Sequence, residues 1–482
     1  MGENFPNWLT KSMIKGIRSF NIDSYLLALE GWRRGLKLTW YYDTPQETDI
    51  KLIGFNSIGK IYSLESKEGK KHYFYRSRGD RVSNKAVDIA SNKDETKRIL
   101  INNGVNVPIG KDFNKSNSKT EIIEQSQKIG FPLAIKPTQG SLGNGVFTDV
   151  NREEDLGYAI DYIRNELEYN DVLIEKHIEG EEYRLYVVGK ELVACTLKEA
   201  PNVVGNGKNS IKDLIEQKNE LRKENPHLSR KLIKMNEQLK KQLGKFNYSL
   251  DTVLENNEKV YLNTVANTSV GGESTNLEMS QIPVKVKEEA IKAIASFPNL
   301  GHAGLDIIVK EDQAYVIEVN TTASFLQHIF PLKGEPINVC SKIIDYYFPE
   351  TKDCLANEKI YFNYKKVSEI LKDRLSQSVE ITTLEAKVEP MVKRYIISGK
   401  VQGVGFREYT RREASRYQIN GYVKNLKNGN VVVIAWTTNK ENLLKFEKKL
   451  WKGSKKSSVE QIKELNWDKQ LNVGFEIRKS KD

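Results

Sequence analysis

The chain has 482 residues, of which 29% are charged and 39% are hydrophobic, a length that corresponds to about three domains of ~150 residues each. No apolar run approaches the ~18 residues of a membrane helix, and the opening MGENFPNWLTKSMIKGIRSF lacks the apolar stretch of a signal peptide. Three scattered cysteines, Cys195, Cys340 and Cys354, match neither a disulfide framework nor a zinc site. We therefore expect a cytoplasmic protein with reduced thiols and no membrane partner.

The net charge of +11 is concentrated in one part of the chain. From Met391 to Asp482 there are 21 Lys and Arg against 9 Asp and Glu, an excess of 12 positive charges. Such a basic region is either a solvated lysine-rich surface or a surface that attracts an anionic substrate. No RNA-binding aromatic motif accompanies it, so we do not expect a nucleic-acid partner.

Residues 1–90 have the pattern of a small α/β domain. Apolar residues recur at helical spacing in SYLLALEGWRRGL (24–36), and the following KLTWYY is typical of a strand. A second helix is predicted in NKDETKRILINNG, which ends at Gly104. Strands then alternate with helices as far as about residue 200.

Two polar regions lie further along the chain. Residues 208–246 are rich in Lys, Glu and Gln and are broken at Pro226, which fits a solvated helical hairpin and a mobile lid over a site equally well. Residues 351–389 are weakly patterned, with one amphipathic helix in YKKVSEILKDRL, and we expect them to form a linker.

The segment FPLAIKPTQGSLGNGVFTDV places a lysine in an apolar strand, directly before a glycine-rich loop. An unpaired ammonium at Lys136 would be costly inside a sheet, so this lysine either binds an anion or extends its amine to solvent. A strand follows the loop where the dinucleotide-binding and P-loop motifs require a helix, which excludes both. We expect a flap that closes over a triphosphate, formed by Gly140, Ser141, Gly143, Asn144 and Gly145.

The strand in DVLIEKHIEGEEYRLYVVG ends in a group of polar residues. Backbone groups of Glu175, Lys176 and Ile178 at this strand exit could pair with an adenine edge, and Glu182 could accept hydrogen bonds from ribose hydroxyls. His177 is either catalytic or, as is more common for a single histidine, a packing or solvent-facing residue.

The segment GLDIIVKEDQAYVIEVN predicts a β-hairpin with its turn at residues 311–313. In that register Asp306 faces Glu318, and Asn320 lies on the same face. Two facing carboxylates repel each other unless a cation lies between them, and oxygen ligands with an amide suit Mg²⁺ that bridges phosphates. The alternative is a surface carboxylate pair. Ahead of the hairpin, ANTSVGGEST offers candidate oxyanion contacts at Asn267, Gly271 and Gly272.

Together these motifs resemble those of the ATP-grasp ligases, in particular the cyanophycin synthetases and the ligase half of the bifunctional glutathione synthetases. The similarity runs from about Asn92 to Tyr347 and includes EKHIEGEEYRLYVV, VVGNGKNSIKDLI, ANTSVGGEST and an IEVN…H…G ending. The resemblance implies that a carboxylate is phosphorylated by ATP and that an amine then attacks the acyl phosphate.

The same resemblance implies roles for individual residues. Lys97 and Lys136 would contact the nucleotide, Glu182 the ribose, and Arg184 the acyl phosphate or the substrate carboxylate. Asp306, Glu318 and Asn320 would hold two Mg²⁺ ions, and His328 and Gly334 would border the acceptor. Asn263 and Lys198 stand where arginine is common in that family.

The last ninety or so residues predict the order βαββαβ of a ferredoxin-like sandwich. The elements are a strand (392–398), a glycine loop, a helix (406–418), a hairpin in GYVKNLKNGNVVVIAW, a helix in NKENLLKFEKKLWKG and a closing strand in LNVGFEIRK. Gly403 and Gly405 permit an anion-binding nest, and Arg407 can hold a phosphoryl group through two hydrogen bonds. KVQGVGFR and GYVKNLKNG resemble the acylphosphatase signature, which implies that Arg407 and the loop amides bind phosphate and that Asn425 orients the attacking water.

These observations predict a multidomain fold of the α+β and α/β classes. It would comprise an N-terminal α/β domain (1–90), an ATP-grasp domain (91–350), a linker (351–389) and a ferredoxin-like acylphosphatase domain (390–482). We expect a ligase that uses ATP and Mg²⁺ to join amino acids or peptides, with a fused acylphosphatase. Relatives of such ligases often form dimers or tetramers, and the sequence leaves both a homo-oligomer and a monomer open. The alternatives are an acylphosphatase with a regulatory nucleotide-binding part, and a basic docking surface for an anionic polymer.

Overall fold

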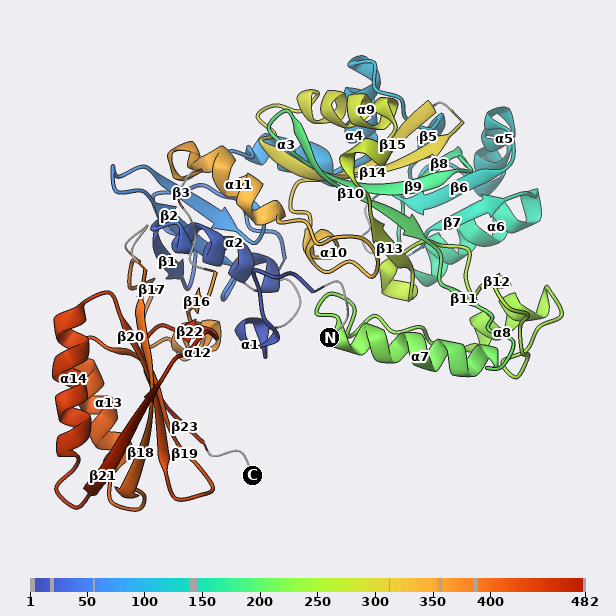
Figure 1. The fold of residues 1–482 in the computed structure, drawn as a ribbon. Helices are drawn as coiled ribbons and strands as arrows, with labels where there is room; N and C mark the ends of the chain where they lie inside the picture. The colour runs from blue at the N-terminus through green and yellow to red at the C-terminus, as the bar shows by residue number, and fades with distance from the viewer. Residues whose placement is uncertain are drawn as a thin grey trace. The chain divides into compact units, whose positions relative to one another are not determined.

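A computed structural model describes residues 5–17, 21–54, 57–138, 145–311, 313–352, 354, 358–384 and 389–479. Contacts divide the chain into two compact units, which Figure 1 colours by residue number. The first unit comprises Met1–Pro6, Thr48–Ile53 and Phe74–Tyr347, and the second comprises Asn7–Glu47, Gly54–Tyr73 and Phe348–Asp482. Within the described ranges, no helix is both long and apolar enough to cross a membrane.

A four-stranded antiparallel sheet of order β5-β8-β6-β7 forms one part of the first unit. Its elements are β5 (Gly110–Phe113), α5 (Lys119–Ile129), β6 (Leu133–Pro137), β7 (Phe147–Val150), α6 (Glu153–Asp161), a π-helical turn (Tyr162–Glu166) and β8 (Val172–Lys176). Leu133 and Ile135 of β6 are buried in the core against α5 and α6. Because side chains alternate along a strand, Lys136 points away from that core.

A second antiparallel sheet, of order β13-β10-β9-β14-β15, forms the largest core of the first unit. Its strands are β9 (Glu181–Val188), β10 (Glu191–Glu199), β13 (Glu273–Asn276), β14 (His302–Lys310) and β15 (Gln313–Asn320). The helices α3 (Asn84–Ser91), α4 (Lys93–Asn102) and α9 (Val284–Ala295) contribute apolar side chains to the same core.

The polar region after residue 200 folds around a small core of its own. It contains β11 (Asn202–Val204), α7 (Ile211–Glu224), α8 (Glu237–Gly244) and β12 (Lys259–Tyr261). Helix α7 begins with a capping box formed by Ser210 and Asp213, and it ends two residues before Pro226. The first unit is completed by β4 (Arg78–Gly79), the 3₁₀ turns Thr268–Val270 and Met279–Gln281, α10 (Leu326–Ile329) and α11 (Val339–Tyr347).

The first half of the second unit combines the N-terminal residues with the segment expected to be a linker. Its elements are α1 (Lys11–Ile14), α2 (Asn21–Arg33), β1 (Lys37–Tyr41), β2 (Ile61–Glu65), the first three residues of β3 (Lys71–Tyr75), a 3₁₀ turn (Pro349–Thr351), β16 (Ile360–Tyr361), α12 (Tyr364–Lys372) and β17 (Ser378–Ile381). Strand β17 pairs with β1, and Trp32 of α2 donates a hydrogen bond to the Thr382 carbonyl at 2.9 Å. Arg33 donates to the carbonyls of Glu358 and Ile360 at 2.7 and 2.8 Å. Described parts of the segment 351–389 thus pack against α2 and β1, and the domain boundaries stay a prediction.

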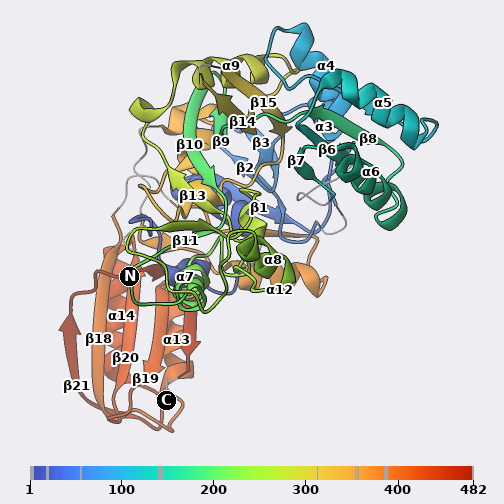
Figure 2. The same ribbon diagram turned by 90° about the vertical axis from the view of Figure 1, so that its right-hand side faces the viewer.

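The second half of this unit is a five-stranded sheet of order β21-β18-β20-β19-β23. Its elements are β18 (Met391–Lys400), α13 (Phe406–Arg416), β19 (Asn420–Asn425), β20 (Val431–Thr437), α14 (Lys440–Lys452), β21 (Ser458–Leu465), β22 (Leu471–Asn472) and β23 (Phe475–Arg478). Figures 1 and 2 show α13 and α14 on one face of the sheet. The expected ferredoxin-like order is confirmed, but β21 takes the fourth position, and the predicted closing strand, β23, is a fifth strand parallel to β19.

Candidate active sites

One face of the sheet β13-β10-β9-β14-β15 carries a row of polar side chains. The strand register pairs Asn276 with Thr196, Thr196 with Arg184, Arg184 with Asp306, and Asp306 with Glu318. Directly paired residues of antiparallel strands point to the same side of a sheet, so each strand contributes one residue to this polar row. The predicted pairing of Asp306 with Glu318 is confirmed, but the predicted turn at 311–313 is not, because Gln313 belongs to β15 and pairs with Lys310. An irregularity between Asp306 and Ile307 shifts the register by one residue and produces the expected pair.

Neighbouring positions on the same strands build the opposite, apolar face. Cys195, Leu185, Leu305 and Val319 lie one residue away from members of the polar row and are buried in the core against α9. Close-packed interiors resist displacement, so this core holds the polar row in a fixed arrangement.

Two cations hold Asp306 within the polar row. Its Oδ2 accepts a hydrogen bond from Arg184 Nη1 at 2.7 Å, and its Oδ1 lies 3.7 Å from Lys198 Nζ. Burial raises the pKa of the Asp306 carboxyl, but Arg184 and then Lys198 outweigh burial and hold that pKa below its usual value. Lys198 also forms an ion pair with Glu182, whose pKa is raised by burial. Asp306 is therefore ionised at neutral pH.

Asp306, Glu318 and Asn320 are the oxygen donors that this face offers to a divalent cation. Asn320 pairs with Gly304, two residues before Asp306, so it lies on the same face. The Oδ1 atom of Asp306 is buried and has no hydrogen-bond partner among the described residues, which leaves it available to a metal. The part of the chain that the structure describes holds no cluster of three His, Cys, Asp or Glu suited to a metal. The donor set therefore fits Mg²⁺ only if phosphate or water oxygens complete the coordination.

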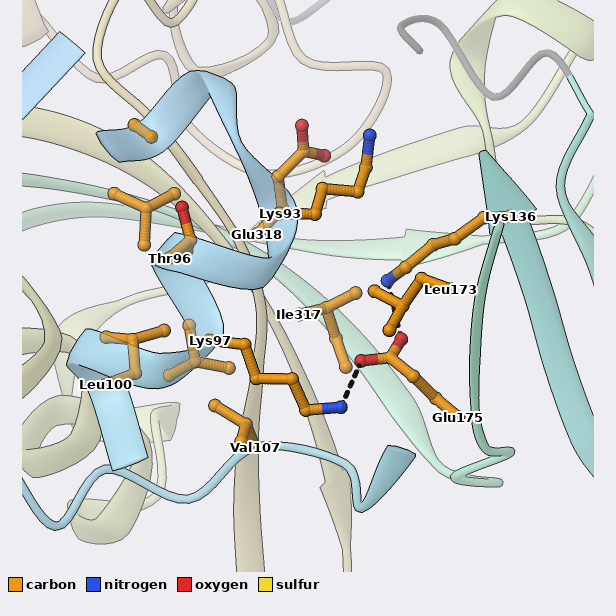
Figure 3. Close-up of a pocket in the computed structure, with 13 residues that line it drawn as sticks. Lys93, Thr96, Lys97, Leu100, Val107, Lys136, Leu173, Glu175, Ile317 and Glu318 are labelled. Carbon is orange, nitrogen blue, oxygen red and sulfur yellow. Dashed lines mark hydrogen bonds and ion pairs between the residues drawn. The ribbon is translucent and has the colours of Figure 1, made fainter. Parts of the chain in front are cut away.

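A pocket lies between α4 and the strands β6, β8 and β15 (Figure 3). At its wall, Glu175 Oε1 accepts a hydrogen bond from Lys97 Nζ at 2.9 Å, and Glu175 Oε2 lies 2.6 Å from Lys136 Nζ. Burial raises the pKa of the Glu175 carboxyl, but Lys136 and Lys97 outweigh burial and lower it. Two lysines around one carboxylate leave a positive charge that suits an anion.

Lys93 and Thr96 line the same pocket, although the sequence analysis did not single them out. Lys93 stands one helical turn before Lys97 on α4, and in Figure 3 its amine lies beside the Glu318 carboxylate. Burial lowers the pKa of the Lys93 ammonium, while Glu318 raises it. The i, i+4 spacing of Lys93 and Lys97 is the signal that could have found this residue. Because Glu318 belongs to both the pocket and the polar row, the two adjoin.

The second candidate site is the loop between β18 and α13. Gly403 and Gly405 have φ values of 72° and 76°, in the left-handed region that favours glycine. A Cβ atom at either position would meet no described atom within 4 Å, so the loop faces open space. Gln402 Nε2 donates to the carbonyls of Leu426 and Asn430 at 2.9 and 2.8 Å, which fixes the loop against the turn after β19.

Arg407 and Asn425 flank this loop. Arg407 lies in the first turn of α13, where the helix N-terminus adds a partial positive charge. Asn425 is the last residue of β19, and its Oδ1 atom is buried without a hydrogen-bond partner among the residues that the structure places. An unsatisfied buried oxygen is costly, and a bound donor such as water would satisfy it.

Three family models match the chain. A RimK-like ATP-grasp domain matches residues 90–212, an ATP-grasp domain matches residues 246–323, and Acylphosphatase matches residues 393–477. The chain contains an ATP-grasp domain followed by an acylphosphatase domain. The polar row and the lysine pocket lie in the first domain, and the glycine loop lies in the second.

Relatives of known function share only part of their length with this chain. Cyanophycin synthetase of Synechocystis sp. is 29% identical over 272 residues, which are 55% of this chain and 31% of that protein. The glutathione biosynthesis bifunctional protein of Clostridium perfringens is 29% identical over 330 residues, 64% of this chain and 42% of that protein. The solved structure of a bifunctional glutathione synthetase from Pasteurella multocida is 25% identical, with a TM-score of 0.46, and covers 60% of this chain and 41% of that one. The chain thus spans less than half the length of these relatives.

Some residues expected to contact the nucleotide have structural partners in the ATP-grasp domain. The Lys176 ammonium donates to the carbonyls of Gly130 and Phe131 at 3.0 and 2.6 Å, and its backbone N–H donates to the Ile109 carbonyl at 2.7 Å. His177 is half-buried, and burial lowers the pKa of its imidazole. Contacts of Ile178 and of the backbone at this strand exit with adenine stay a prediction.

The expected flap falls mostly outside the described residues, which exclude Gly140, Ser141, Gly143 and Asn144. Gly145 is described, with a φ of 73°. A Cβ atom there would come within 2.9 Å of Leu167 and 3.1 Å of Pro137, so the position is too crowded for a side chain. A role of this segment over a triphosphate stays a prediction.

The expected oxyanion loop is closely packed by Arg222 of α7. This buried arginine donates to the carbonyls of Thr268 and Gly272 at 3.2 and 3.1 Å. A Cβ atom at Gly271 would lie 2.7 Å from Ile233, and one at Gly272 would lie 2.7 Å from the Asn267 carbonyl. The two glycines are thus required by packing, and oxyanion contacts of Asn267, Gly271 and Gly272 stay a prediction.

Proposed function

We propose that the ATP-grasp domain is a carboxylate–amine ligase that uses ATP and Mg²⁺ to join amino acids or peptides in the cytoplasm, and releases ADP and phosphate. The observation that carries this proposal is the ionised Asp306, paired with Glu318 across the ladder and bonded to Arg184 at 2.7 Å. The adjoining lysine pocket supplies positive charge for phosphates. The relatives that make cyanophycin and glutathione support amino-acid or peptide substrates.

Each group in the two adjoining regions has a place in an acyl-phosphate mechanism. Lys97 and Lys136 would bind nucleotide phosphates, and Arg184 would bind the carboxylate as it becomes an acyl phosphate. Asp306, Glu318 and Asn320 would hold Mg²⁺, which when bound neutralises phosphate charge. Phosphoryl transfer of this kind depends on positioning and charge stabilisation, which these side chains provide without a covalent nucleophile.

We further propose that the acylphosphatase domain hydrolyses acyl phosphates. The Oδ1 atom of Asn425 is buried and has no partner among the described residues, and together with the open glycine loop it favours this activity over an inactive fold. Arg407 and the loop amides would bind the phosphoryl group, and Asn425 would orient a water molecule. The acyl phosphate formed by a ligase belongs to the substrate class of this domain, so the domain could remove intermediates that fail to react.

The test of the ligase proposal is a screen of amino acids and dipeptides for ADP release, with product masses measured by mass spectrometry. Asp306→Asn is expected to reduce ADP release by about 100-fold or more, because it removes a charge that acts on the reacting phosphates. Asp373→Asn, at an exposed carboxylate after α12, is the matched control and is expected to have no effect. ADP release that no substrate pair stimulates, or that survives Asp306→Asn, would refute the proposal.

The acylphosphatase proposal is tested with benzoyl phosphate as a generic substrate. Arg407→Ala and Asn425→Ala are expected to abolish its hydrolysis, while Asp306→Asn leaves it intact. The editing role predicts that ADP release without amide formation falls in Arg407→Ala, and unchanged futile turnover in both variants would contradict it. Hydrolysis with no ligation under any condition would instead favour a regulatory role for the ATP-grasp domain.

A further inference from the structure

His328 ends the polar row at a fully buried position in α10. Its Nδ1 atom lies 2.7 Å from the hydroxyl oxygen of Thr196, the β10 member of the row. The same hydroxyl lies 2.7 Å from Asn276 Oδ1 on β13. These three side chains form one hydrogen-bonded chain, and a hydroxyl has a single proton to share between its two neighbours.

The orientation of Asn276 decides where that proton lies. Asn276 Nδ2 is 2.7 Å from the carbonyl of His328 and 2.8 Å from the carbonyl of Glu335. Both carbonyls only accept hydrogen bonds, so the NH₂ group must face them and Oδ1 must face Thr196. Because Oδ1 also only accepts, the Thr196 hydroxyl donates its proton to Asn276.

It follows that His328 donates to Thr196 through Nδ1–H. A neutral imidazole then carries its lone pair on Nε2, and burial lowers the pKa of His328 to about 3, which keeps the ring neutral. Nε2 is buried and has no hydrogen-bond partner among the described residues. The network therefore presents a fixed hydrogen-bond acceptor, unsatisfied by the described residues, next to the sheet face that carries Arg184 and Asp306.

A hydrogen-bond donor on a ligand would satisfy this acceptor. Phosphates, carboxylates and acyl phosphates offer lone pairs, which would repel Nε2, and Arg184 already donates to Asp306. Among the reacting groups of a ligase, the amine alone has N–H bonds.

We propose that His328 Nε2 accepts a hydrogen bond from the amine substrate and so aims the amine lone pair at the acyl phosphate. Thr196 and Asn276 are positioning residues that set the tautomer of His328. This inference rests on the proposed ligase function.

The first test needs no substrate. The chain has five histidines, and ¹⁵N-histidine NMR with the individual His→Gln variants assigns the His328 signal. The wild-type protein is expected to show Nδ1 protonated and Nε2 unprotonated at neutral pH. Thr196→Ser is expected to keep this tautomer, and Thr196→Val to lose the preference. A wild-type His328 protonated on Nε2 would overturn the inference, whether or not Thr196→Val folds.

The second test separates this inference from the ligase proposal. Hydroxylamine traps acyl phosphates as hydroxamates, so hydroxamate formation reports the first half of the reaction. Amide formation, measured with the amino-acid pair that the substrate screen identifies, reports the complete reaction. Thr196→Val is expected to raise the KM for the amine about five- to tenfold, the effect of one neutral hydrogen bond, and to lower the ratio of amide to hydroxamate. Thr196→Ser is expected to restore both.

The possible outcomes are distinct. If the wild-type protein forms no hydroxamate with any of the twenty amino acids, the ligase proposal fails, and this inference fails with it. If hydroxamate and amide form but the amine KM is the same in Thr196→Val and wild type, the ligase proposal stands and the role of His328 is refuted.

Discussion

Replacing Glu175 with glutamine should strongly destabilise the small sheet of the ATP-grasp domain. The Glu175 carboxylate bridges Lys97 and Lys136, and all three side chains are almost buried, with exposed fractions of 8%, 11% and 12%. Glutamine keeps one oxygen acceptor for one lysine, but its NH₂ group repels the other ammonium. Breaking a buried ion pair by removing one partner typically costs 3–5 kcal/mol, and with one hydrogen bond retained we expect about 3 kcal/mol.

Hydrogen exchange followed by mass spectrometry measures this effect locally. All six tryptophans (Trp8, Trp32, Trp40, Trp436, Trp451 and Trp467) lie in the second unit, so tryptophan fluorescence cannot follow the change. Peptides that contain β6 and β8 should exchange about 100-fold faster in Glu175→Gln, since 1.4 kcal/mol corresponds to a factor of ten. Peptides from β18 and β20 serve as internal controls and should not change.

Two further measurements sharpen the test. The double variant Glu175→Gln with Lys136→Met removes the unpaired ammonium and should recover part of the lost protection. Because Lys136 and Lys97 lower the pKa of folded Glu175 below its usual 4.5, the stabilisation is present above that value and is lost as pH falls through the lower folded pKa. The difference in hydrogen-exchange rate between wild type and Glu175→Gln should therefore disappear at acidic pH. Unchanged exchange of β6 and β8 at neutral pH would refute the reasoning.

Three other outcomes are expected. Chelation of divalent cations by EDTA should abolish ATP-dependent ligation and leave benzoyl phosphate hydrolysis unchanged. Loss of both activities would contradict the proposal that only the ligase site needs a divalent cation. Gly403→Ala should slow benzoyl phosphate hydrolysis about tenfold, because the left-handed φ of Gly403 costs a residue with a side chain about 1–2 kcal/mol. Equal rates in the variant and the wild type would show that the loop does not need this conformation. Lys93→Met should raise the KM for ATP more than Lys128→Met does, where Lys128 is an exposed lysine on α5 that serves as the control. Equal KM values in the two variants would contradict a contact between Lys93 and the nucleotide.

The hairpin of the candidate site was predictable because its two strands are adjacent in the sequence. The facing pair of Asp306 and Glu318 was expected, but the irregularity between Asp306 and Ile307 that produces it was not, since Lys310 pairs with Gln313 beside the turn. The rest of the polar row was not predictable, since it depends on how β10, β9 and β14 pair across long stretches of sequence. Lys136 was found through its place in an apolar strand and Lys97 through family resemblance, but their shared partner Glu175 was expected to contact adenine.

Two features of the second unit were not predicted, and both have the same physical cause. In the segment 351–389, strand β17 pairs with β1, more than 300 positions earlier, so no local pattern shows that the segment is packed. Strand β21, with the sequence SVEQIKEL, lies at the edge of its sheet and has no fully buried residue. An edge strand needs little apolar periodicity, and its polar sequence therefore concealed the fourth strand of the acylphosphatase domain.

Charge balance explains why the two phosphate sites should differ in their need for a metal. The polar row and lysine pocket contain five cations (Lys93, Lys97, Lys136, Arg184 and Lys198) and four carboxylates (Glu175, Glu182, Asp306 and Glu318), a net charge of +1. A triphosphate carries about four negative charges, so these side chains alone leave most of that charge uncompensated, and bound Mg²⁺ would supply the remainder. The loop of the acylphosphatase domain, VQGVGFR, contains Arg407 and no carboxylate, and it meets a single phosphoryl group with backbone N–H groups. Sensitivity to chelation should thus follow from the side chains that each site contributes, although both sites would bind the same kind of group.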